Sequence, residues 1–355
     1  MRQPVRLAVV GAGLVGQRHI SAICDLDDDI QLAAIVEPQE IFAPPAPVFT
    51  SIEQMFERVM PDGVILSTPT PLHVSGGFAC VSRGVPVLIE KPLATSADEA
   101  RQLTTTAAER EVPLLVGHHR RHNPLIRRAA ELIKEGTIGE LRAAQVTCWF
   151  YKPDDYFEIA PWRKKQGAGP ISVNLVHDVD LMRYFMGEVV SVQAQMAPSR
   201  RGFENEDLAA ALLRFDSGAL CTITVSDSVV SPWSWELTSN EHPIYPNTNE
   251  SCYLLGGSKG ALSIPDMRLW HHEGGEDWWK PIKSRSTEHV PSDPLINQII
   301  HFADVIRGLD TPLVSGEEGL RTLHVIEAIQ QAAINQELIT LTNSGAVEPK
   351  LAIQE

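Results

Sequence analysis

The sequence predicts an α/β fold in which a doubly wound parallel sheet is followed by an α+β domain with a large, mostly antiparallel, open sheet. Short β-branched runs alternate with helical patterns up to about residue 119, and strand-like runs follow one another after residue 140. The length of 355 residues also exceeds what one hydrophobic core usually organises. We expect domains at residues 1–122 and 123–345, then an unstructured tail at residues 346–355.

The first domain is expected to contain a series of short, apolar strands joined by helices. These strands are Val5–Val10, Leu32–Val36, Gly63–Leu66, Val85–Ile89 and Pro113–Val116. Ser51 with Gln54, and Ser96 with Glu99, have the capping-box spacing that begins a helix. Strands that alternate with helices in this way pair in parallel.

The second domain begins with a helix and continues mainly as strands. Asn123 and Pro124 suit the N-cap and first position of a helix that runs to Gly136. Strand-like segments follow at residues 141–151, 190–198, 207–215, 218–226 and 251–264. Further helices are expected at about 172–185, 294–307 and 316–336.

Charge and cysteine content narrow the class of protein. The formal net charge of −15, with no basic stripe to offset it, disfavours nucleic acids and anionic membranes as partners and leaves a small-molecule substrate. The 5 cysteines are far apart and form no CxxC pair, which indicates reduced thiols in the cytoplasm. We also expect neither a signal peptide nor a membrane span.

A glycine-rich turn directly follows the first strand. In Gly11-Ala12-Gly13-Leu14-Val15-Gly16, the first glycine permits a tight turn and the second lets backbone amides approach a pyrophosphate. The third allows close packing of the helix, whose N-terminus attracts phosphate. This pattern predicts a Rossmann dinucleotide-binding domain, with cofactor contacts from Gly11, Gly13, Leu14, Val15 and Gly16.

Glu37 ends the second strand at the distance from the glycines where a carboxylate accepts the adenosine ribose hydroxyls. The same carboxylate would repel a 2′-phosphate, so NAD is expected in preference to NADP, although Gln39 and Arg18 could modify this preference. The alternative interpretation of Glu37 is a solvated acid at a strand end, with no role in cofactor binding.

Two polar loops follow later strands, where ligands of such sheets bind. The first runs from Ser67 to His73, and its Thr68, Pro69 and His73 are expected beside the cofactor, unless the loop is only a rigid connection. The second is Glu90-Lys91-Pro92, in which proline stops the strand and permits a cis peptide bond. A lysine there can donate to a reacting oxygen, although most exposed lysines have no such role.

Together these motifs resemble the glucose-fructose oxidoreductase, inositol dehydrogenase and rhizopine-catabolism (Gfo/Idh/MocA) family of NAD(P)-dependent oxidoreductases. The resemblance continues through Val116–Pro124, Gly167–Gly187 and the closing helices. It implies that Lys91 is the active-site lysine, with Glu90 beside the cofactor. It also implies that the open sheet binds substrate and joins subunits in a homodimer or homotetramer.

The resemblance further implies a catalytic histidine at His177. The family usually has Asp four residues before this histidine, whereas Val173 occupies that position here and Asn174 lies three before it. Asparagine cannot exchange a proton, so His177 remains as the proton carrier and Asn174 can only hydrogen-bond and orient. The other substrate contacts implied by the resemblance are Arg121, Tyr151, Trp162 and Arg163.

The expected function is hydride transfer between a nicotinamide and a hydroxyl carbon of a sugar, polyol or related cyclic small molecule. One alternative is a dihydrodiol- or imine-reducing relative. The other is a non-catalytic NAD-binding sensor of the same fold, but a sensor would have no use for Lys91 and His177. His118, His119 and His122 cluster, but no carboxylate or thiolate stands at ligand spacing, so no metal is expected. The tryptophans of residues 233–279 suit sheet packing, a subunit interface or the pocket.

Overall fold

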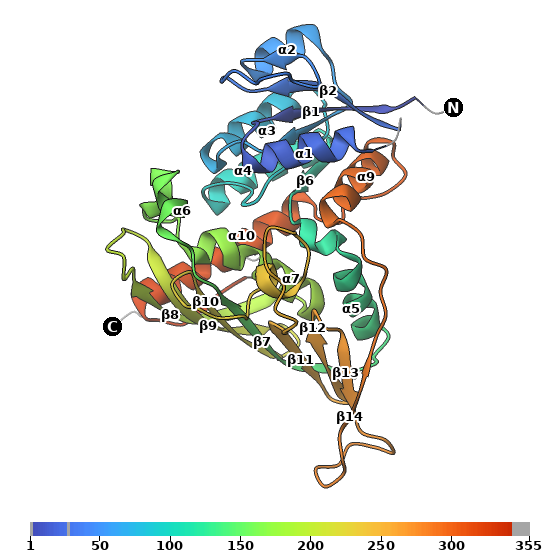
Figure 1. Cartoon of the computed structure of the whole chain (residues 1–355), viewed down its shortest axis with the longest axis vertical. Helices are drawn as coiled ribbons and strands as arrows, with labels where there is room; N and C mark the ends of the chain where they lie inside the picture. Colours follow the sequence, from blue (N-terminus) through green and yellow to red (C-terminus); the bar gives the residue numbers. More distant parts are fainter. Residues whose placement is uncertain (1–2, 27–28, 343–355) are drawn as a thin grey trace. The chain divides into compact units, whose positions relative to one another are not determined.

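The computed structural model describes residues 3–26 and 29–342 (Figure 1). The expected tail at residues 346–355 lies outside them, as do residues 343–345. The described chain forms two compact units. The first unit extends to Asn123 and adds Ser292–Leu323, while the second contains Pro124–Pro291 and the described residues from His324 onward. Ser292–Leu323, which the sequence analysis grouped with the second domain, is thus part of the first unit.

The first unit contains a parallel sheet of 6 strands in the order β3-β2-β1-β4-β5-β6. Their bounds are β1 (Val5–Val10), β2 (Ile30–Val36), β3 (Val48–Phe49), β4 (Gly63–Leu66), β5 (Val87–Ile89) and β6 (Leu114–Val116). The expected strands all form, and only the two-residue edge strand β3 is additional. The strand order reverses between β1 and β4, which is where doubly wound sheets bind ligands.

Helices cover both faces of this sheet. In β1, Leu7 and Val9 pack into one hydrophobic cluster, whereas Ala8 and Val10 pack into another on the opposite face. Because both faces are covered, the strand is a continuous apolar run. The first face carries α1 (Leu14–Cys24) and α9 (Pro294–Ile306), and the second carries α2 (Ile52–Arg58), α3 (His73–Val81) and α4 (Ala97–Glu109). As predicted, Ser51 and Ser96 cap α2 and α4.

The second unit contains a sheet of 9 strands in the order β14-β13-β12-β11-β7-β10-β9-β8-β15. All neighbours are antiparallel except β7 and β10, which are parallel. The bounds are β7 (Leu141–Trp149), β8 (Val189–Pro198), β9 (Glu206–Phe215), β10 (Leu220–Ser226), β11 (Tyr253–Gly257), β12 (Gly260–Ile264), β13 (Arg268–His271), β14 (Lys283–Ser286) and β15 (Ile339–Thr340). The mostly antiparallel sheet is therefore confirmed. The expected single strand at residues 251–264 is wrong, because the turn at Ser258-Lys259 folds it into a hairpin.

Within residues 3–26 and 29–342, helices cover one face of this sheet and leave the other uncovered. The covered face packs on α5 (Pro124–Lys134), α7 (Val176–Met186) and the later part of α10 (Gly316–Asn335). Along β9, Ala209, Ala211 and Leu213 point to this core, while Leu208 and Leu212 are 39% and 36% exposed. The alternation leaves apolar side chains on the uncovered face.

Short helical segments complete the chain. They are η1 (Thr70–Leu72), η2 (His119–His122), α6 (Asp154–Glu158), η3 (Pro161–Lys164), η4 (Ile171–Leu175) and α8 (Trp235–Thr238). The tryptophans divide into different environments: Trp235 is buried and stacks on Tyr253, while Trp278 and Trp279 are 88% and 87% exposed between β13 and β14. They therefore do not form a single cluster.

Candidate functional site

The glycine loop between β1 and α1 is shaped by close backbone contacts. Gly11 has a φ of +90°, and a Cβ there would lie 2.8 Å from the Ser67 carbonyl oxygen. A Cβ on Gly16 would lie 1.9 Å from the Gly11 carbonyl oxygen, whereas a Cβ on Gly13 would have no atom within 4 Å. Gly13 is also the N-cap of α1 and makes no side-chain capping bond. Open space at the start of a helix fits a pyrophosphate.

Glu37 lies directly after β2 and faces this loop. Its Oε2 accepts the backbone N–H of Ala12 at 2.8 Å, and its Oε1 accepts that of Gln39 at 3.1 Å. A carboxylate has about four acceptor positions, so both oxygens keep lone pairs for further donors. The two hydrogen bonds fix the carboxylate beside the glycine turn, where a ribose would require it.

His73 connects the two polar loops that follow β4 and β5. Its Nε2 lies 2.8 Å from the Thr68 carbonyl oxygen, and its Nδ1 lies 2.8 Å from that of Pro92. Burial lowers the pKa of His73, although the two carbonyl oxygens favour the protonated ring and partly offset this effect. The imidazole therefore links the loop after β4 to the loop after β5 and stabilises both at the carboxyl edge of the sheet.

A buried carboxylate stands beside the candidate catalytic lysine. Glu90 Oε1 lies 2.8 Å from Nε2 of His19, a fully buried residue of α1, and Glu90 Oε2 accepts the backbone N–H of Lys91 at 3.2 Å. Burial raises the pKa of Glu90. The hydrogen bond from His19 and the positive charges of His19, His119 and Lys91 outweigh it and hold the pKa at about 2. Glu90 thus joins α1 to Lys91.

Lys91 itself is half-buried, and its peptide bond to Pro92 is cis, as the sequence allows. Arg121, expected near cofactor and substrate, is buried in the same unit, where its Nη1 lies 3.0 Å from Oε2 of Glu318. This ion pair joins η2 to the first turn of α10.

In the second unit, His177 and Asn174 lie on one helical segment. Asn174 belongs to the π-helical η4 and His177 to the first turn of α7, so the segment is not the uniform α-helix expected from the sequence. His177 is buried, and so are both neighbouring acids, Asp178 and Asp180. The Tyr253 hydroxyl donates to Asp178, which ties α7 to β11. Asp178 therefore stabilises the helix rather than facing solvent.

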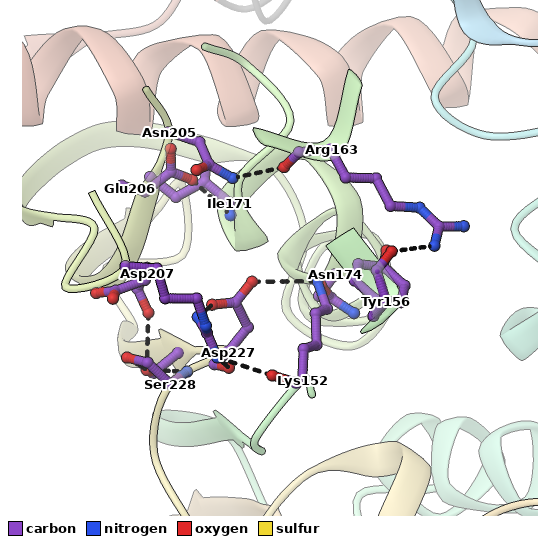
Figure 2. A network of polar contacts seen from close by, with 12 residues as sticks. Lys152, Tyr156, Arg163, Ile171, Asn174, Asn205, Glu206, Asp207, Asp227 and Ser228 are labelled. Atoms are coloured by element: carbon purple, nitrogen blue, oxygen red, sulfur yellow. Dashed lines mark hydrogen bonds and ion pairs between the residues drawn. The ribbon is translucent and has the colours of Figure 1, made fainter. Parts of the chain in front are cut away.

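Asn174 contacts a buried ion-pair network that the sequence analysis missed (Figure 2). Its Oδ1 accepts a hydrogen bond from Lys152 Nζ at 2.9 Å. Lys152 also lies 3.4 Å from Oδ2 of Asp227, whose Oδ1 lies 3.1 Å from Nη1 of Arg201. Lys152 and Asp227 follow the ends of β7 and β10, which pair in parallel. Polar residues after neighbouring parallel strands were the available signal.

The aromatic candidates differ in exposure. Tyr151 and Trp162 are 53% and 58% exposed, so their rings are available to a ligand. The Arg163 guanidinium lies 3.9 Å from the centre of the Tyr156 ring, and its Nη1 donates to the Tyr156 carbonyl oxygen at 2.7 Å. Arg163 is therefore held by Tyr156 near the start of the helical segment that carries Asn174.

Each unit thus gathers its own set of candidate residues. The first unit places the glycine loop, Glu37, the Thr68–His73 loop and Lys91 at the carboxyl edge of its sheet. In the second unit, Asn174 contacts the polar network through Lys152. Asn174 lies three residues before His177 in the sequence. Neither unit contains both Lys91 and His177.

Both units match known protein families. Residues 5–118 match the oxidoreductase family with an NAD-binding Rossmann fold (GFO_IDH_MocA), and residues 126–263 match the GFO/IDH/MocA C-terminal domain. Over 297 residues the chain is 32% identical to 1,5-anhydro-D-fructose reductase of Ensifer adhaerens, covering 80% of this chain and 81% of the relative. Over 353 residues it is 26% identical to scyllo-inositol 2-dehydrogenase (NADP(+)) IolW of Bacillus subtilis (strain 168), covering 95% and 96%.

A solved structure has the same fold. The WlbA dehydrogenase from Bordetella pertussis, in complex with NADH and UDP-GlcNAcA, superposes with a TM-score of 0.77 at 26% identity. The alignment covers 96% of this chain and 99% of that one. Among the described residues, no helix is both long and apolar enough to cross a membrane.

Proposed function

The chain belongs to the Gfo/Idh/MocA family of NAD(P)-dependent oxidoreductases, and on this basis we propose that it moves a hydride between NAD and a hydroxyl carbon of a sugar, polyol or related cyclic small molecule. The observation that carries the proposal is Lys91, held after β5 by a buried carboxylate that also bonds to the cofactor-binding helix. Relatives named as acting on an inositol and an anhydrofructose support a polyhydroxylated ring.

We assign the chemical roles to Lys91 and His177. A bound nicotinamide supplies the hydride acceptor. As the hydride leaves the substrate carbon, the His177 imidazole accepts the proton of the hydroxyl on that carbon. The Lys91 ammonium donates a hydrogen bond to the same oxygen and stabilises its developing negative charge. This assignment gives cofactor binding to residues 1–122 and most substrate contacts to residues 123–345, with Lys91 contributed by the first range.

The test is a screen of sugars, inositols and dihydrodiols that follows NADH formation by absorbance. Lys91→Ala and His177→Ala should each lower kcat by about 10²–10⁴-fold, since each removes a group that acts on the reacting oxygen. The dissociation constant for NAD should change much less. Lys165→Ala, which alters an exposed ion pair with Glu204, is the matched control. Near-normal turnover in both variants would exclude this mechanism, and oxidation of dihydrodiols alone would favour the alternative substrate class.

We propose that NAD is the preferred cofactor because Glu37 stands where the adenosine ribose would lie. Glu37→Ala should weaken NAD binding by about tenfold, the usual cost of losing hydrogen bonds to a charged group. NADP binding should weaken less or improve, because the repulsion of the 2′-phosphate is removed. Isothermal titration of both cofactors measures the ratio. A wild-type preference for NADP would contradict the proposal.

We also propose that the uncovered face of the second sheet joins subunits in a homodimer or homotetramer. Its exposed apolar side chains are Leu208, Leu212, Leu220 and Leu254. Apolar side chains gathered on one sheet face favour association with a like surface.

A further inference from the structure

The ammonium of Lys152 is nearly fully enclosed. The residue is 8% exposed, and its Nζ lies over the rings of Phe150 and Tyr156, 5.4 Å and 5.0 Å from their centres. Burying an ammonium is costly unless it is paired. Among the described residues, it forms an ion pair with Asp227 and a hydrogen bond with the Asn174 side chain, and it also interacts electrostatically with the Glu206 carboxyl.

Arg201 holds this arrangement together. Its Nη2 donates to the backbone carbonyl oxygens of Lys152 and Asp227, at 2.8 Å and 2.9 Å. Its Nη1 pairs with the Asp227 carboxylate. The Arg201 guanidinium therefore links the backbone after β7 to the backbone after β10, which fixes where the ammonium lies.

Lys152 dictates which way the Asn174 amide points. An ammonium has three donors and no acceptor, so it can face only the carbonyl oxygen of the amide. The amide nitrogen must then point away from Lys152. Asn174 is half-buried, and within the described part of the chain the only hydrogen-bond partner of its side-chain amide is Lys152, so both N–H groups of the amide remain available to a ligand.

We propose that Lys152 is a positioning residue that makes Asn174 a hydrogen-bond donor to an oxygen lone pair of the substrate. This inference rests on the proposed function, and it specifies the ligand group: a carbonyl or carboxylate oxygen, which has no proton to offer. In a redox pair, the carbonyl form of the substrate meets this requirement fully. The hydroxyl form can instead rotate to accept or to donate.

Asn174→Asp separates this role from a structural one. The new carboxylate would still accept from Lys152, now as an ion pair, so the melting temperature should not fall. It would offer no donor and would repel a second acceptor oxygen. We expect KM for the carbonyl form with NADH to rise at least about tenfold, and KM for the hydroxyl form with NAD to rise less. An unchanged KM in both directions would overturn the proposal.

Lys152→Met tests the positioning step. Asp227 keeps Arg201 as its partner, while the Asn174 amide loses the group that orients it, so KM should rise several-fold with a smaller change in kcat. Combined with Asn174→Asp, the second change should add little, because both act through one hydrogen bond. Additive effects would show that Lys152 acts otherwise. Lys165→Met, in an exposed pair with Glu204, is the control and should behave as wild type.

A neutron crystal structure of the deuterated wild-type protein decides the amide orientation without turnover. We expect two deuterium atoms on the Asn174 nitrogen, directed away from Lys152. Deuterium on the side facing Lys152 would overturn the inference even if the enzyme is active. If no sugar or polyol is turned over, the proposed function fails, and the neutron density still settles which group Asn174 presents.

Discussion

Glu90 shows how one buried carboxylate can serve several elements. It accepts from a side chain on α1 and from the backbone after β5, and its carboxyl group lies against Gly117, directly after β6, where a Cβ would come within 2.9 Å of it. A carboxylate removed from water is unstable unless its oxygens are hydrogen-bonded. His19 supplies that bond. The positions of α1 and of the loop after β5, which carries Lys91, are therefore coupled through Glu90.

This pairing predicts a specific acid sensitivity. The pKa of Glu90 is about 2 in the folded protein against an ordinary value of 4.5. A lowered folded-state pKa contributes stability above the ordinary value that is lost as pH falls from about 4.5 to about 2. Glu90→Gln should therefore reduce the free energy of unfolding at pH 7 by on the order of 3 kcal/mol and flatten its decline below pH 4.5. Urea unfolding across this pH range measures both.

Glu204→Gln is the control for this experiment. Glu204 pairs with Lys165 on the surface, where solvent screens the ion pair, so the unfolding curves should match those of the wild type. Parallel curves for Glu90→Gln and the wild type between pH 7 and pH 3 would show that the His19 contact does not stabilise the ionised carboxylate.

Sequence reasoning can propose residues from their local position, but it misses those whose contacts depend on distant partners. Glu37 and Lys91 follow the ends of predicted strands, so the sheet itself suggests a ligand role. His19 was not singled out in the sequence, because its partner is 71 residues away. Lys152 was missed for the same reason. Its meaning appears only when β7 and β10 are paired.

At the level of elements, α1 depends on glycines with different purposes. Gly16→Ala would place a Cβ 1.9 Å from the Gly11 carbonyl oxygen, so the helix could not pack on the turn. Gly13→Ala meets no atom within 4 Å, and its φ of −67° suits alanine. We expect Gly16→Ala to lower the free energy of unfolding by about 2–4 kcal/mol. Gly13→Ala should leave it within about 0.5 kcal/mol.

The same pair of variants tests the cofactor site. Gly13→Ala should weaken NAD binding at least about tenfold, because its methyl group occupies the space through which a pyrophosphate reaches the helix N-terminus. Thermal unfolding with and without NAD separates the effects: Gly13→Ala should keep the wild-type melting temperature but lose its increase on adding NAD. A normal increase would show that Gly13 does not line the cofactor site.

Element types were more predictable than their exact form. The strands of the first sheet follow from apolar runs that are buried on both faces. The break between β11 and β12 was missed, although Gly256-Gly257-Ser258-Lys259-Gly260 is a glycine-rich run typical of a turn. The π-helical start before α7 was also unpredicted, since apolar spacing cannot reveal a change of hydrogen-bond register over five residues.

At the scale of the whole molecule, the two sheets differ in how many of their faces are covered by helices. Both faces of the first sheet are covered by helices of its own unit. The second sheet buries one face under α5, α7 and α10, and its other face keeps leucines 36–49% exposed in β9, β10 and β11. These strands are neighbours of β7 or of one another, so the leucines share the central part of the sheet.

A charge placed at the centre of this face should therefore separate the subunits. Leu212→Glu points out from β9, opposite to the core, so the monomer should fold normally while two like charges would meet across a symmetric interface. Light scattering after size-exclusion chromatography should show a dimer or tetramer for the wild type and a monomer of about 39 kDa for the variant. Met60→Glu, at a residue 56% exposed in the first unit, controls for added charge and should keep the wild-type mass. An unchanged oligomer in Leu212→Glu, or a monomeric wild type, would mean that this face does not join subunits, and its leucines would then need another explanation.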